Sequence, residues 1–364
     1  MSNKYEFIIT FIYFIYLDFK ILTFVKINIK FYRGSNILFL LRILTKVLHL
    51  LPSELSHKLS LEGLKIITFF GFKVRSDSSS LTLLNINFAN KLGLAAGLDK
   101  NGDYIDSLSA LGFGFLEIGT VTPRPQKGNQ KPRLFRIKSQ KALVNSMGFN
   151  NKGVDHLVGR VEKRNSKIPL GISIGKNLDT PIELALDDYL ICLEKVYNLA
   201  DYIAVNISSP NTKNLRELQT KDYINKLLAS IKDVQLKLAS KVGYTPILIK
   251  ISPDLTRSNL KILSESVLNN KLDGIICTNT TSQHNHSSAK GGLSGKPLFL
   301  PSTSTLELVR EFVGKDLPII ASGGVMDLDS FNKKMDKGAD LVQIYTGFIY
   351  EGPSLVDEII NSAS

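Results

Sequence analysis

The chain has 364 residues, of which 43% are hydrophobic and 21% charged, a composition typical of one large α/β barrel or two smaller globular domains. Two cysteines, Cys192 and Cys277, are too few for a disulfide scaffold or a four-cysteine zinc site. Both stand in apolar runs, which predicts buried thiols and a reducing compartment. The formal net charge is +12, and residues 1–80 hold half of this excess, with eleven Lys or Arg against five Asp or Glu. Basic residues beside apolar sequence favour an anionic membrane surface over nucleic acid as the partner.

Residues 1–35 are predicted to form an apolar, basic N-terminal extension. Its apolar run covers 7–25, but the charge-free part ends at residue 17, and a transmembrane helix needs about 20 apolar residues. Asp18 and Lys20 would each cost about 2.5–3.5 kcal/mol at a membrane centre. The run also lacks the small-residue cleavage site of a signal peptide. A marginal membrane span, an interfacial segment and a poorly ordered extension all stay open for this run.

Residues 36–75 are predicted to form a pair of short helices. The first covers 36–52 and ends at Pro52, and Ser53 is the expected N-cap of the second, over 54–70. The first helix carries a narrow polar stripe on an otherwise apolar surface, made of Arg42, Thr45, Lys46 and His49. Such large apolar faces favour a hairpin that associates with the membrane interface, with the stripe turned to lipid head groups or to the second helix. A pair packed on the core of a domain is the alternative.

Residues 76–364 are predicted to form a (β/α)8 TIM barrel, an α/β fold. Eight short apolar runs recur there, at 91–97, 115–121, 170–175, 202–208, 246–252, 274–279, 318–324 and 341–347. Amphipathic patterns separate most of them, for example at 182–200, 221–240, 257–269 and 355–362. Apolar strands that alternate with helices indicate a parallel sheet buried on both faces, and eight units match a barrel. The segment 132–146 alternates like an additional hairpin, and a doubly wound open sheet is the alternative fold.

Polar residues crowd onto the predicted carboxyl ends of the strands, where barrels build their active sites. They are Asp99, Lys100, Thr120, the stretch 206–212, Lys250, Thr278 and Asn279. A lysine inside an apolar strand, such as Lys250, costs desolvation energy unless it meets an anion. His284 and His286 lie in a polar loop without a third ligand nearby, so no metal site is expected.

The last two predicted strands end in glycine turns, "SGG" (322–324) and "YTG" (345–347). Glycines after the last two strands of a barrel let backbone N–H groups reach phosphate oxygens. The barrel is therefore expected to hold a phosphorylated cofactor. The sequence contains neither G-x-G-x-x-G nor a Walker loop, which argues against NAD in a dinucleotide-binding domain and against ATP.

Seven blocks of the sequence carry a resemblance to a known family: "LAAGLDKNG", "EIGTVTPRPQKGNQKPRLFR", "NSMGFNNKG", "NISSPNT", "TNTT", "GGLSGKPL" and "QIYTGF". They resemble the quinone-dependent, class 2 dihydroorotate dehydrogenases, in family order, from the first predicted helix to the C-terminus. The resemblance implies an FMN-containing (β/α)8 barrel that oxidises (S)-dihydroorotate to orotate in pyrimidine (UMP) biosynthesis and passes the electrons to a membrane quinone. It also implies that the N-terminal helical pair forms the quinone entrance at the bilayer.

The resemblance assigns the chemistry to the block "NISSPNT" (206–212). The serine that matches Ser209 is the general base that removes the C5 proton of dihydroorotate, while hydride leaves C6 for flavin N5. A serine is a poor base at its ordinary pKa and needs a dry site and a relay, which the resemblance places at Thr212 and Phe149. The matching substrate positions are Lys100, Asn145, Ser146, Met147, Gly148, Phe149, Asn206, Asn211, Asn279 and Thr280. Four asparagines suit a flat ring with alternating C=O and N–H groups, because an amide offers both donor and acceptor.

The resemblance also implies a set of FMN contacts. The matching positions are Ala96, Gly97, Lys100, Thr120, Ser173, Asn206, Lys250, Thr278, Gly295, Gly324, Tyr345 and Thr346. Lys250 is expected near the flavin ring, where positive charge stabilises the reduced anion. The chain departs from the family in "GISIGKN" (171–177), because the family has an asparagine at the position of Ser173. A direct FMN contact of this shorter side chain, or one through water, stays open.

A rival reading is an FMN-barrel reductase like the tRNA-dihydrouridine synthases. Those enzymes use a cysteine acid, and neither Cys192 nor Cys277 is predicted at a strand end suited to that role. Class 1 dihydroorotate dehydrogenases have a cysteine where Ser209 stands and lack the N-terminal helices. The expected partners are dihydroorotate and orotate, a membrane quinone and anionic lipid, with no nucleic acid. The expected location is peripheral, on the cytoplasmic face of a bacterial inner membrane.

Overall fold

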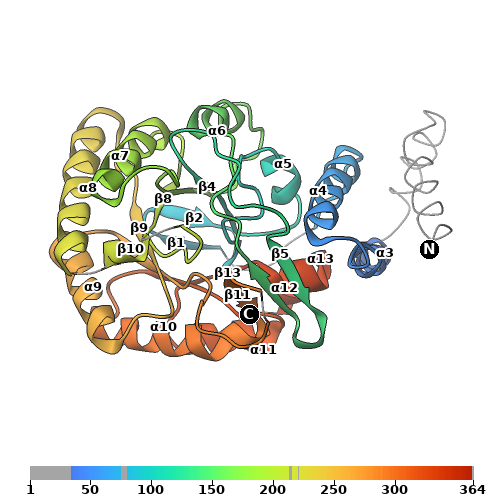
Figure 1. Cartoon of the computed structure of the whole chain (residues 1–364). Helices are drawn as coiled ribbons and strands as arrows, with labels where there is room; N and C mark the ends of the chain where they lie inside the picture. The colour runs from blue at the N-terminus through green and yellow to red at the C-terminus, as the bar shows by residue number, and fades with distance from the viewer. Residues whose placement is uncertain (1–33, 75–79, 213–214, 220, 288, 363–364) are drawn as a thin grey trace.

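The computed structural model describes residues 34–74, 80–212, 215–219, 221–287 and 289–362. The predicted extension 1–35, with its apolar run 7–25, lies almost wholly outside the described residues. Two helices, α3 (Gly34–Leu48) and α4 (Ser53–Phe69), precede a barrel and lie at its side, next to α12 and α13 (Figure 1).

Eight parallel strands close into a barrel in the order β10-β12-β13-β3-β4-β7-β8-β9. Their bounds are β3 (Leu92–Leu94), β4 (Phe115–Val121), β7 (Leu170–Ile174), β8 (Tyr202–Asn206), β9 (Ile247–Ile251), β10 (Gly274–Cys277), β12 (Ile319–Ser322) and β13 (Leu341–Ile344). Each strand lies within one of the eight predicted apolar runs, and all of its residues are buried. Closure of the sheet confirms the barrel and rules out the open-sheet alternative.

Helices surround the barrel in the intervals between the strands (Figure 1). They are α5 (Ile105–Ser109), α6 (Val154–Val161), α7 (Ala185–Val196), α8 (Lys221–Val242), α9 (Arg257–Asn269), α10 (Phe299–Val313), α11 (Leu328–Asp336), α12 (Thr346–Glu351) and α13 (Pro353–Ser362). The helix predicted over 257–269 matches α9, which begins there because the Thr256 side chain accepts a hydrogen bond from the Asn259 N–H. An antiparallel hairpin of β1 (Leu81–Leu83) and β2 (Ile86–Phe88) packs on the apolar cluster that includes Phe115 and Leu341, at the amino-terminal end of the barrel.

A small antiparallel sheet adds residues to the opposite end. It pairs β11 (Gly292–Gly295) with β6 (Ala142–Asn145), and β6 with β5 (Leu134–Ile137). The hairpin predicted over 132–146 is therefore confirmed, whereas the strand in "GGLSG" was not anticipated. Short 3₁₀ turns complete the chain: η1 (Lys138–Gln140), η2 (Ile182–Leu184), η3 (Leu215–Gln219) and η4 (Lys296–Leu298).

Two residues of the polar stripe of α3, Arg42 and His49, contact α12, while Lys46 is exposed. The Arg42 guanidinium lies 3.5 Å from the Glu351 carboxylate, and His49 Nε2 lies 2.9 Å from the Ile349 carbonyl oxygen of α12. The predicted orientation was therefore wrong for His49, whose ring bonds to α12, whereas Arg42, with 53% of its side chain exposed, forms only an ion pair with Glu351. The predicted cap was also wrong, since α4 starts at Ser53 itself after Pro52 and has no side-chain cap.

The outward face of the helical pair is apolar. Its exposed side chains are Leu40, Ile43, Leu44, Val47, Leu50, Leu55, Ile66 and Phe69, with Leu50 71% and Phe69 83% exposed. The inner face of α4 contributes Leu61 and Leu64 to the main core. The pair thus packs on the barrel on one side and presents an apolar surface on the other. Within the described ranges, no helix has both the length and the hydropathy needed to cross a membrane.

Candidate active site

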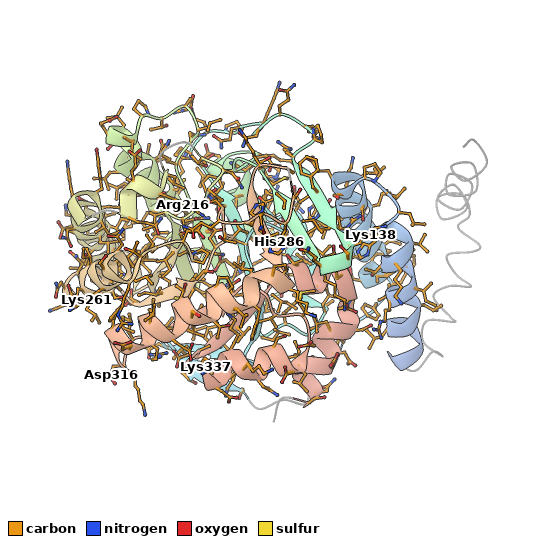
Figure 2. All side chains as sticks on the ribbon, turned by 60° about the horizontal axis from the view of Figure 1, so that its bottom comes forward. Lys138, Arg216, Lys261, His286, Asp316 and Lys337 are labelled. Carbon is orange, nitrogen blue, oxygen red and sulfur yellow. The ribbon has the colours of Figure 1, made fainter. Side chains whose placement is uncertain are left out.

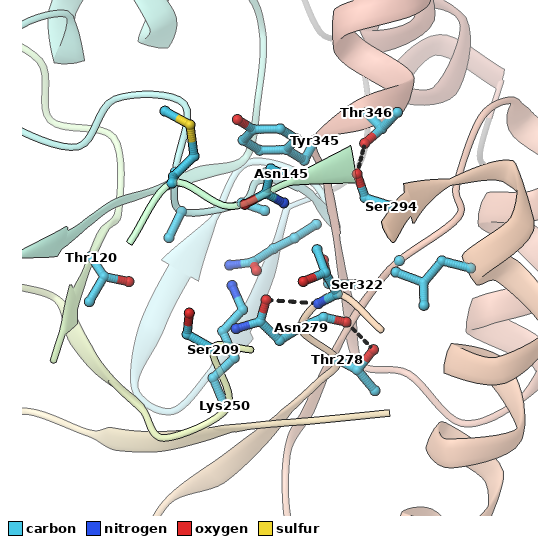
Figure 3. A pocket seen from close by; sticks show the side chains of 18 of the residues that line it. Thr120, Asn145, Ser209, Lys250, Thr278, Asn279, Ser294, Ser322, Tyr345 and Thr346 are labelled. Carbon is cyan, nitrogen blue, oxygen red and sulfur yellow. Dashed lines mark hydrogen bonds between the residues drawn. The ribbon is translucent and has the colours of Figure 1, made fainter. Parts of the chain in front are cut away.

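A cavity opens at the carboxyl ends of the barrel strands (Figure 3). It holds about 1000 Å³ of empty space, open solvent at its mouth included. Every barrel strand except β7, or the loop that follows it, contributes to the lining, and the small sheet supplies Asn145, Ser294 and Gly295 from one side. The parallel strands therefore bring segments more than 200 residues apart in sequence to one site, as barrel topology requires.

Most of the site residues predicted from the sequence line this cavity. They are Ala96, Gly97, Lys100, Thr120, Asn145, Met147, Gly148, Phe149, Asn206, Ser209, Asn211, Lys250, Thr278, Asn279, Thr280, Gly295, Gly324, Tyr345 and Thr346. Three of the predicted residues, Ser146, Ser173 and Thr212, are not part of the lining. Ser173 is fully buried behind Thr120, with 2.9 Å between their hydroxyl oxygens. Thr212 is also buried, and its hydroxyl has no hydrogen-bond partner among the described residues.

Ser209 lies in the loop after β8, and its side chain is almost enclosed, with 5% of the residue exposed. Its Oγ accepts a hydrogen bond of 3.3 Å from the Asn211 N–H. In the described part of the chain, no carboxylate or imidazole is hydrogen-bonded to that hydroxyl. The loop therefore presents to the cavity a hydroxyl group whose one hydrogen bond in the described chain comes from a backbone N–H.

Four asparagine side chains surround the same space and are held by one another. Asn211 Nδ2 donates to Asn145 Oδ1 over 3.0 Å, and Asn206 Nδ2 donates to the Thr120 hydroxyl over 2.8 Å. Asn279 Nδ2 lies 3.0 Å from the Ser208 hydroxyl and 3.3 Å from Asn206 Oδ1. These bonds fix the amide orientations and leave further amide donors and acceptors for a planar polar ligand.

Lys250 reaches the cavity from β9 and is held by a carboxylate that sequence reasoning missed. Its Nζ lies 3.1 Å from Glu117 Oε1, and both side chains are buried. Glu117 Oε2 accepts hydrogen bonds from Tyr202 OH and Gln343 Nε2, at 3.0 and 2.7 Å. The sequence "FLEIGTV" could have predicted this role of Glu117, because a carboxylate inside an apolar strand needs a partner just as Lys250 does. Gln343 also lines the cavity, and its Oε1 is buried without a protein partner among the described residues.

Two backbone positions after the last two strands fit only glycine: Gly324, in the turn after β12, and Gly347, in the first turn of α12. Gly324 has φ +80°, and a Cβ there would lie 2.3 Å from Phe299 Cα, while a Cβ on Gly347 would lie 2.3 Å from the Val325 oxygen. The Thr346 and Ser294 hydroxyls are 2.8 Å apart beside these turns (Figure 3). Such bare backbone, edged by hydroxyl groups, suits an anionic phosphate.

A buried cation stands behind the first of these turns. Lys334 Nζ donates to the Ser302 hydroxyl over 2.7 Å, and Ser302 Oγ lies 2.9 Å from the Gly323 carbonyl oxygen. Burial lowers the pKa of Lys334 to about 7. Lys100, at the opposite wall, donates to the Gly97 carbonyl over 2.7 Å, and burial, followed by the nearby Arg133, lowers its pKa to about 8.

A second, more apolar cavity of about 1830 Å³ lies between the helical pair and the barrel. Leucines and isoleucines of α3 and α4 form much of its wall, together with Arg136 and His57. Burial lowers the pKa of His57 to about 4, so its imidazole is neutral at pH 7. Lys100, Met147 and Tyr345 line both cavities, which therefore adjoin at these side chains.

Neither cysteine reaches the first cavity. Cys192 is buried in α7, and Cys277, although it ends β10, packs in the main apolar core. Burial raises the pKa of Cys277 to about 12. Cys277 ends a strand, but its thiol lies among apolar side chains and outside the cavity, which agrees with the expectation that its position does not suit a cysteine acid.

The fold and the polar cavity at the carboxyl ends of its strands define a (β/α)8-barrel enzyme. Residues 78–363 match the family model described as dihydroorotate dehydrogenase. The chain therefore belongs to the dihydroorotate dehydrogenase family. The curated relative named dihydroorotate dehydrogenase (quinone) from Acinetobacter baylyi is 50% identical over 320 residues, covering 86% of this chain and 96% of the relative. The relative of the same name from Shewanella denitrificans is 46% identical over 328 residues, covering 87% and 97%.

Solved structures agree with this assignment. DHODH of Eimeria tenella in complex with ferulenol superposes with a TM-score of 0.78 at 33% identity, covering 84% of this chain and 89% of that chain. The ligand-free DHODH of the same organism gives the same TM-score at 34% identity, covering 85% and 93%. The chain is thus an oxidoreductase of the quinone-type branch of its family, a branch of flavin-dependent enzymes that act in pyrimidine biosynthesis.

Proposed function

We propose that the protein oxidises (S)-dihydroorotate to orotate with FMN and passes the electrons to a membrane quinone. The observation that carries this proposal is the pair of adjoining cavities. One is polar, ringed by asparagines around Ser209, and the other is apolar and lies under the helical pair. A polar heterocycle and a hydrophobic acceptor can therefore reach opposite sides of one region of the barrel, near Lys100, Met147 and Tyr345.

The residues of the first cavity fit FMN. The glycine turns at Gly324 and Gly347, with the Thr346 hydroxyl, would hold its phosphate, and Lys250 would hold a polar edge of the ring. The unpartnered Gln343 Oε1 supports this assignment, because a buried acceptor without a donor is costly in the absence of a ligand. When bound, FMN would accept the hydride that leaves C6 of the substrate.

Ser209 is the proposed base for the C5 proton. Its hydroxyl is enclosed, and exclusion of water strengthens its interactions with a bound substrate. The Ser209 Oγ takes the C5 proton as its own proton passes on, and the buried Thr212 hydroxyl, which has no partner in the described chain, is the proposed next member of the relay. Removal of this proton from C5 and of hydride from C6 leaves the C5–C6 double bond of orotate. The asparagine amides orient the ring.

The second cavity is the proposed quinone site, and the surface above it is the proposed membrane contact. The apolar outward face of α3 and α4 would enter the interface, so a quinone could pass from the bilayer between the helices. The basic N-terminal part of the sequence would add attraction to anionic lipid. This arrangement supports a peripheral location, and we propose the cytoplasmic face of a bacterial inner membrane.

An acceptor assay tests the proposal. The purified protein is mixed with dihydroorotate and, separately, a long-chain quinone, fumarate or NAD, and orotate formation is measured. We expect a bound yellow flavin and turnover with quinone alone. Turnover with fumarate or NAD but not with quinone would contradict the proposed acceptor, and a colourless protein that binds no FMN would contradict the proposed cofactor.

A further inference from the structure

Arg216 ties together three loops around the active site without lining the cavity itself. It stands on η3, after the loop that carries Ser209, and Figure 2 shows it within the outline of the molecule, whereas Lys261 lies at the edge. Its side chain is 25% exposed. The guanidinium donates to the Ser208 carbonyl oxygen over 3.2 Å and to the Thr280 carbonyl oxygen over 3.1 Å.

A carboxylate from a third loop holds the same guanidinium. Arg216 Nη1 lies 2.6 Å from Asp254 Oδ2, in the loop after β9, and 2.8 Å from the Ser282 hydroxyl. Asp254 Oδ2 also accepts a hydrogen bond of 2.8 Å from the Ser282 N–H, and its Oδ1 accepts one from the Thr281 hydroxyl. Burial alone would raise the pKa of this carboxyl, but its hydrogen bonds to Thr281, Ser282 and Arg216 lower it on balance. Asp254 is therefore ionised at pH 7 and fixes the guanidinium in place.

The two carbonyl groups that Arg216 holds belong to Thr280, which lines the cavity, and to Ser208, which is next to a lining residue. Ser208 directly precedes Ser209 in the sequence, and Thr280 directly follows Asn279. Ser209, Asn279 and Thr280 line the cavity, whereas Ser208 does not. The Ser208 hydroxyl accepts from Asn279 Nδ2 at 3.0 Å, so the two loops also meet at their polar side chains. The position of Ser209 relative to Asn279 and Thr280 thus depends on the backbone contacts that Arg216 makes.

We propose that Arg216 is a positioning residue for the reaction, which holds Ser209 in register with the ring-binding residues Asn279 and Thr280, and that Asp254 anchors it. The inference rests on the proposed function, in which Ser209 is the base. A guanidinium presents five donors in a rigid planar fork and can serve two carbonyl groups and a carboxylate at once, whereas a lysine ammonium is a single point charge. Displacement of a catalytic group by about 1 Å can cost ~10²-fold in rate.

The test is Arg216→Lys in the FMN-loaded, full-length protein. This variant keeps the ion pair with Asp254 but cannot span both carbonyl groups. We expect the rate of flavin bleaching by dihydroorotate, measured by stopped flow, to fall by about tenfold or more. We expect FMN content, melting temperature and the rate of reoxidation by quinone to stay near those of the wild type.

Two further variants separate positioning from simple structural support. Arg257→Lys is the matched control, because Arg257 pairs with Glu311 at 2.5 Å on the surface, where both side chains are more than half exposed. It should leave the bleaching rate unchanged. In Arg216→Ala, added guanidinium at a concentration too low to denature should restore part of the bleaching rate, as it can occupy the vacated position.

The outcomes are distinct. A bleaching rate of Arg216→Lys equal to that of the wild type would overturn the positioning role while leaving the proposed function intact. Loss of FMN and of thermal stability in proportion to the loss of rate would also overturn it, since Arg216 would then only support the fold. Failure of dihydroorotate to bleach the wild-type flavin would overturn the proposed function, and this inference with it.

Discussion

At the scale of single residues, the site is a set of polar groups whose partners are fixed before any ligand binds. Asn206 holds Thr120, and Asn211 holds Asn145, so little side-chain entropy remains to be lost when a ring enters. Ser209 differs, because its hydroxyl accepts only a backbone N–H in the described chain. A side chain that is enclosed but lightly engaged is suited to move a proton.

Ser209→Ala should slow flavin bleaching by dihydroorotate about 10²–10⁴-fold, because a methyl group cannot take the C5 proton. FMN should stay bound. Ser208→Ala is the matched control, since Ser208 does not line the cavity, and it should keep far more of the rate. Ser209→Cys should keep partial activity with a shifted pH profile, because a thiol ionises at lower pH. Stopped-flow absorbance measures the bleaching rate of all three variants. A near-normal rate in Ser209→Ala would show that Ser209 is not the base.

The lowered pKa of Lys100 leads us to expect that substrate binding depends on pH. Its pKa is lowered to about 8, mainly by burial, so the free protein carries this charge below that pH and loses it above. An anionic ligand binds the protonated form better, and its affinity should be highest below pH 8 and fall by up to about tenfold per pH unit above it. Orotate binding, measured by perturbation of the flavin spectrum, checks this. In Lys100→Met the decline should be absent, and the same decline in that variant would exclude Lys100 as its source.

Removal of one charge from the buried pair of Glu117 and Lys250 should strongly lower the free energy of unfolding. Glu117→Gln leaves the Lys250 ammonium buried without its counter-charge, which costs about 3–5 kcal/mol. The double variant Glu117→Gln with Lys250→Met should recover much of this loss. Urea unfolding of the apoprotein measures it. Lys337→Gln breaks an exposed pair with Glu307 and should cost far less, because solvent screens that pair. An equal loss of stability in Glu117→Gln and Lys337→Gln would contradict the special role of the buried pair.

At the scale of elements, the helical pair is attached to the barrel by a few polar contacts and by its inner apolar face. Arg42 and His49 contact α12, and Glu54 at the start of α4 pairs with Arg133 at 2.9 Å. Leu61 and Leu64 join the main core. The barrel strands begin only at Leu92, and no residue of α3 or α4 lines the first cavity, so that cavity is built without these helices.

Deletion of residues 1–70 should therefore spare the first half-reaction and damage the second. FMN binding and bleaching by dihydroorotate should persist, because none of the residues that line the first cavity precedes Ala95. Reduction of a long-chain quinone should become slow, since the deletion removes one wall of the second cavity. Parallel assays with dihydroorotate and quinone measure the two halves, and unchanged turnover with quinone would refute the proposed entrance.

At the scale of the whole molecule, apolar surface is concentrated on one side. The outward faces of α3 and α4 carry eight exposed large apolar side chains close together, from Leu40 to Phe69. Among the polar residues of α3, His49 is turned inward to α12 and Arg42 pairs with Glu351, whereas Lys46 is exposed. A surface of this kind is typical of an interaction site, and the proposed shallow membrane contact would bury it without a partner protein.

Binding to anionic liposomes should therefore weaken with salt without vanishing, and full release should need detergent, because both charge and apolar burial contribute. Leu50→Glu with Phe69→Glu should abolish the salt-resistant part. Leu300→Glu is the matched control, since Leu300 is 73% exposed on α10, outside the helical pair. Cosedimentation measures binding. Complete release by salt alone would contradict the apolar contact, and resistance to both salt and alkaline extraction would mean that residues 7–25 span the bilayer.

The amino-acid sequence by itself determined the barrel and most of the cavity lining. Apolar runs such as 202–208 need burial on both faces, and helical patterns between eight such runs favour a closed parallel barrel over an open sheet. Since the active site of a barrel lies at the strand ends, the position of Ser209 and Lys250 in the chain predicted that they line the cavity. The family motifs added their roles.

Tertiary structure alone decided which side chains meet. Glu117 lies 133 positions before Lys250, and Arg216 reaches Asp254, Thr280 and Ser282 across three loops. Periodicity indicates which face of an element is polar, not what lies against that face, so it predicted lipid head groups or α4 beside His49, where the structure has α12. Pairing of buried polar groups depends on distances between strands and loops, and those distances exist only once the barrel has closed.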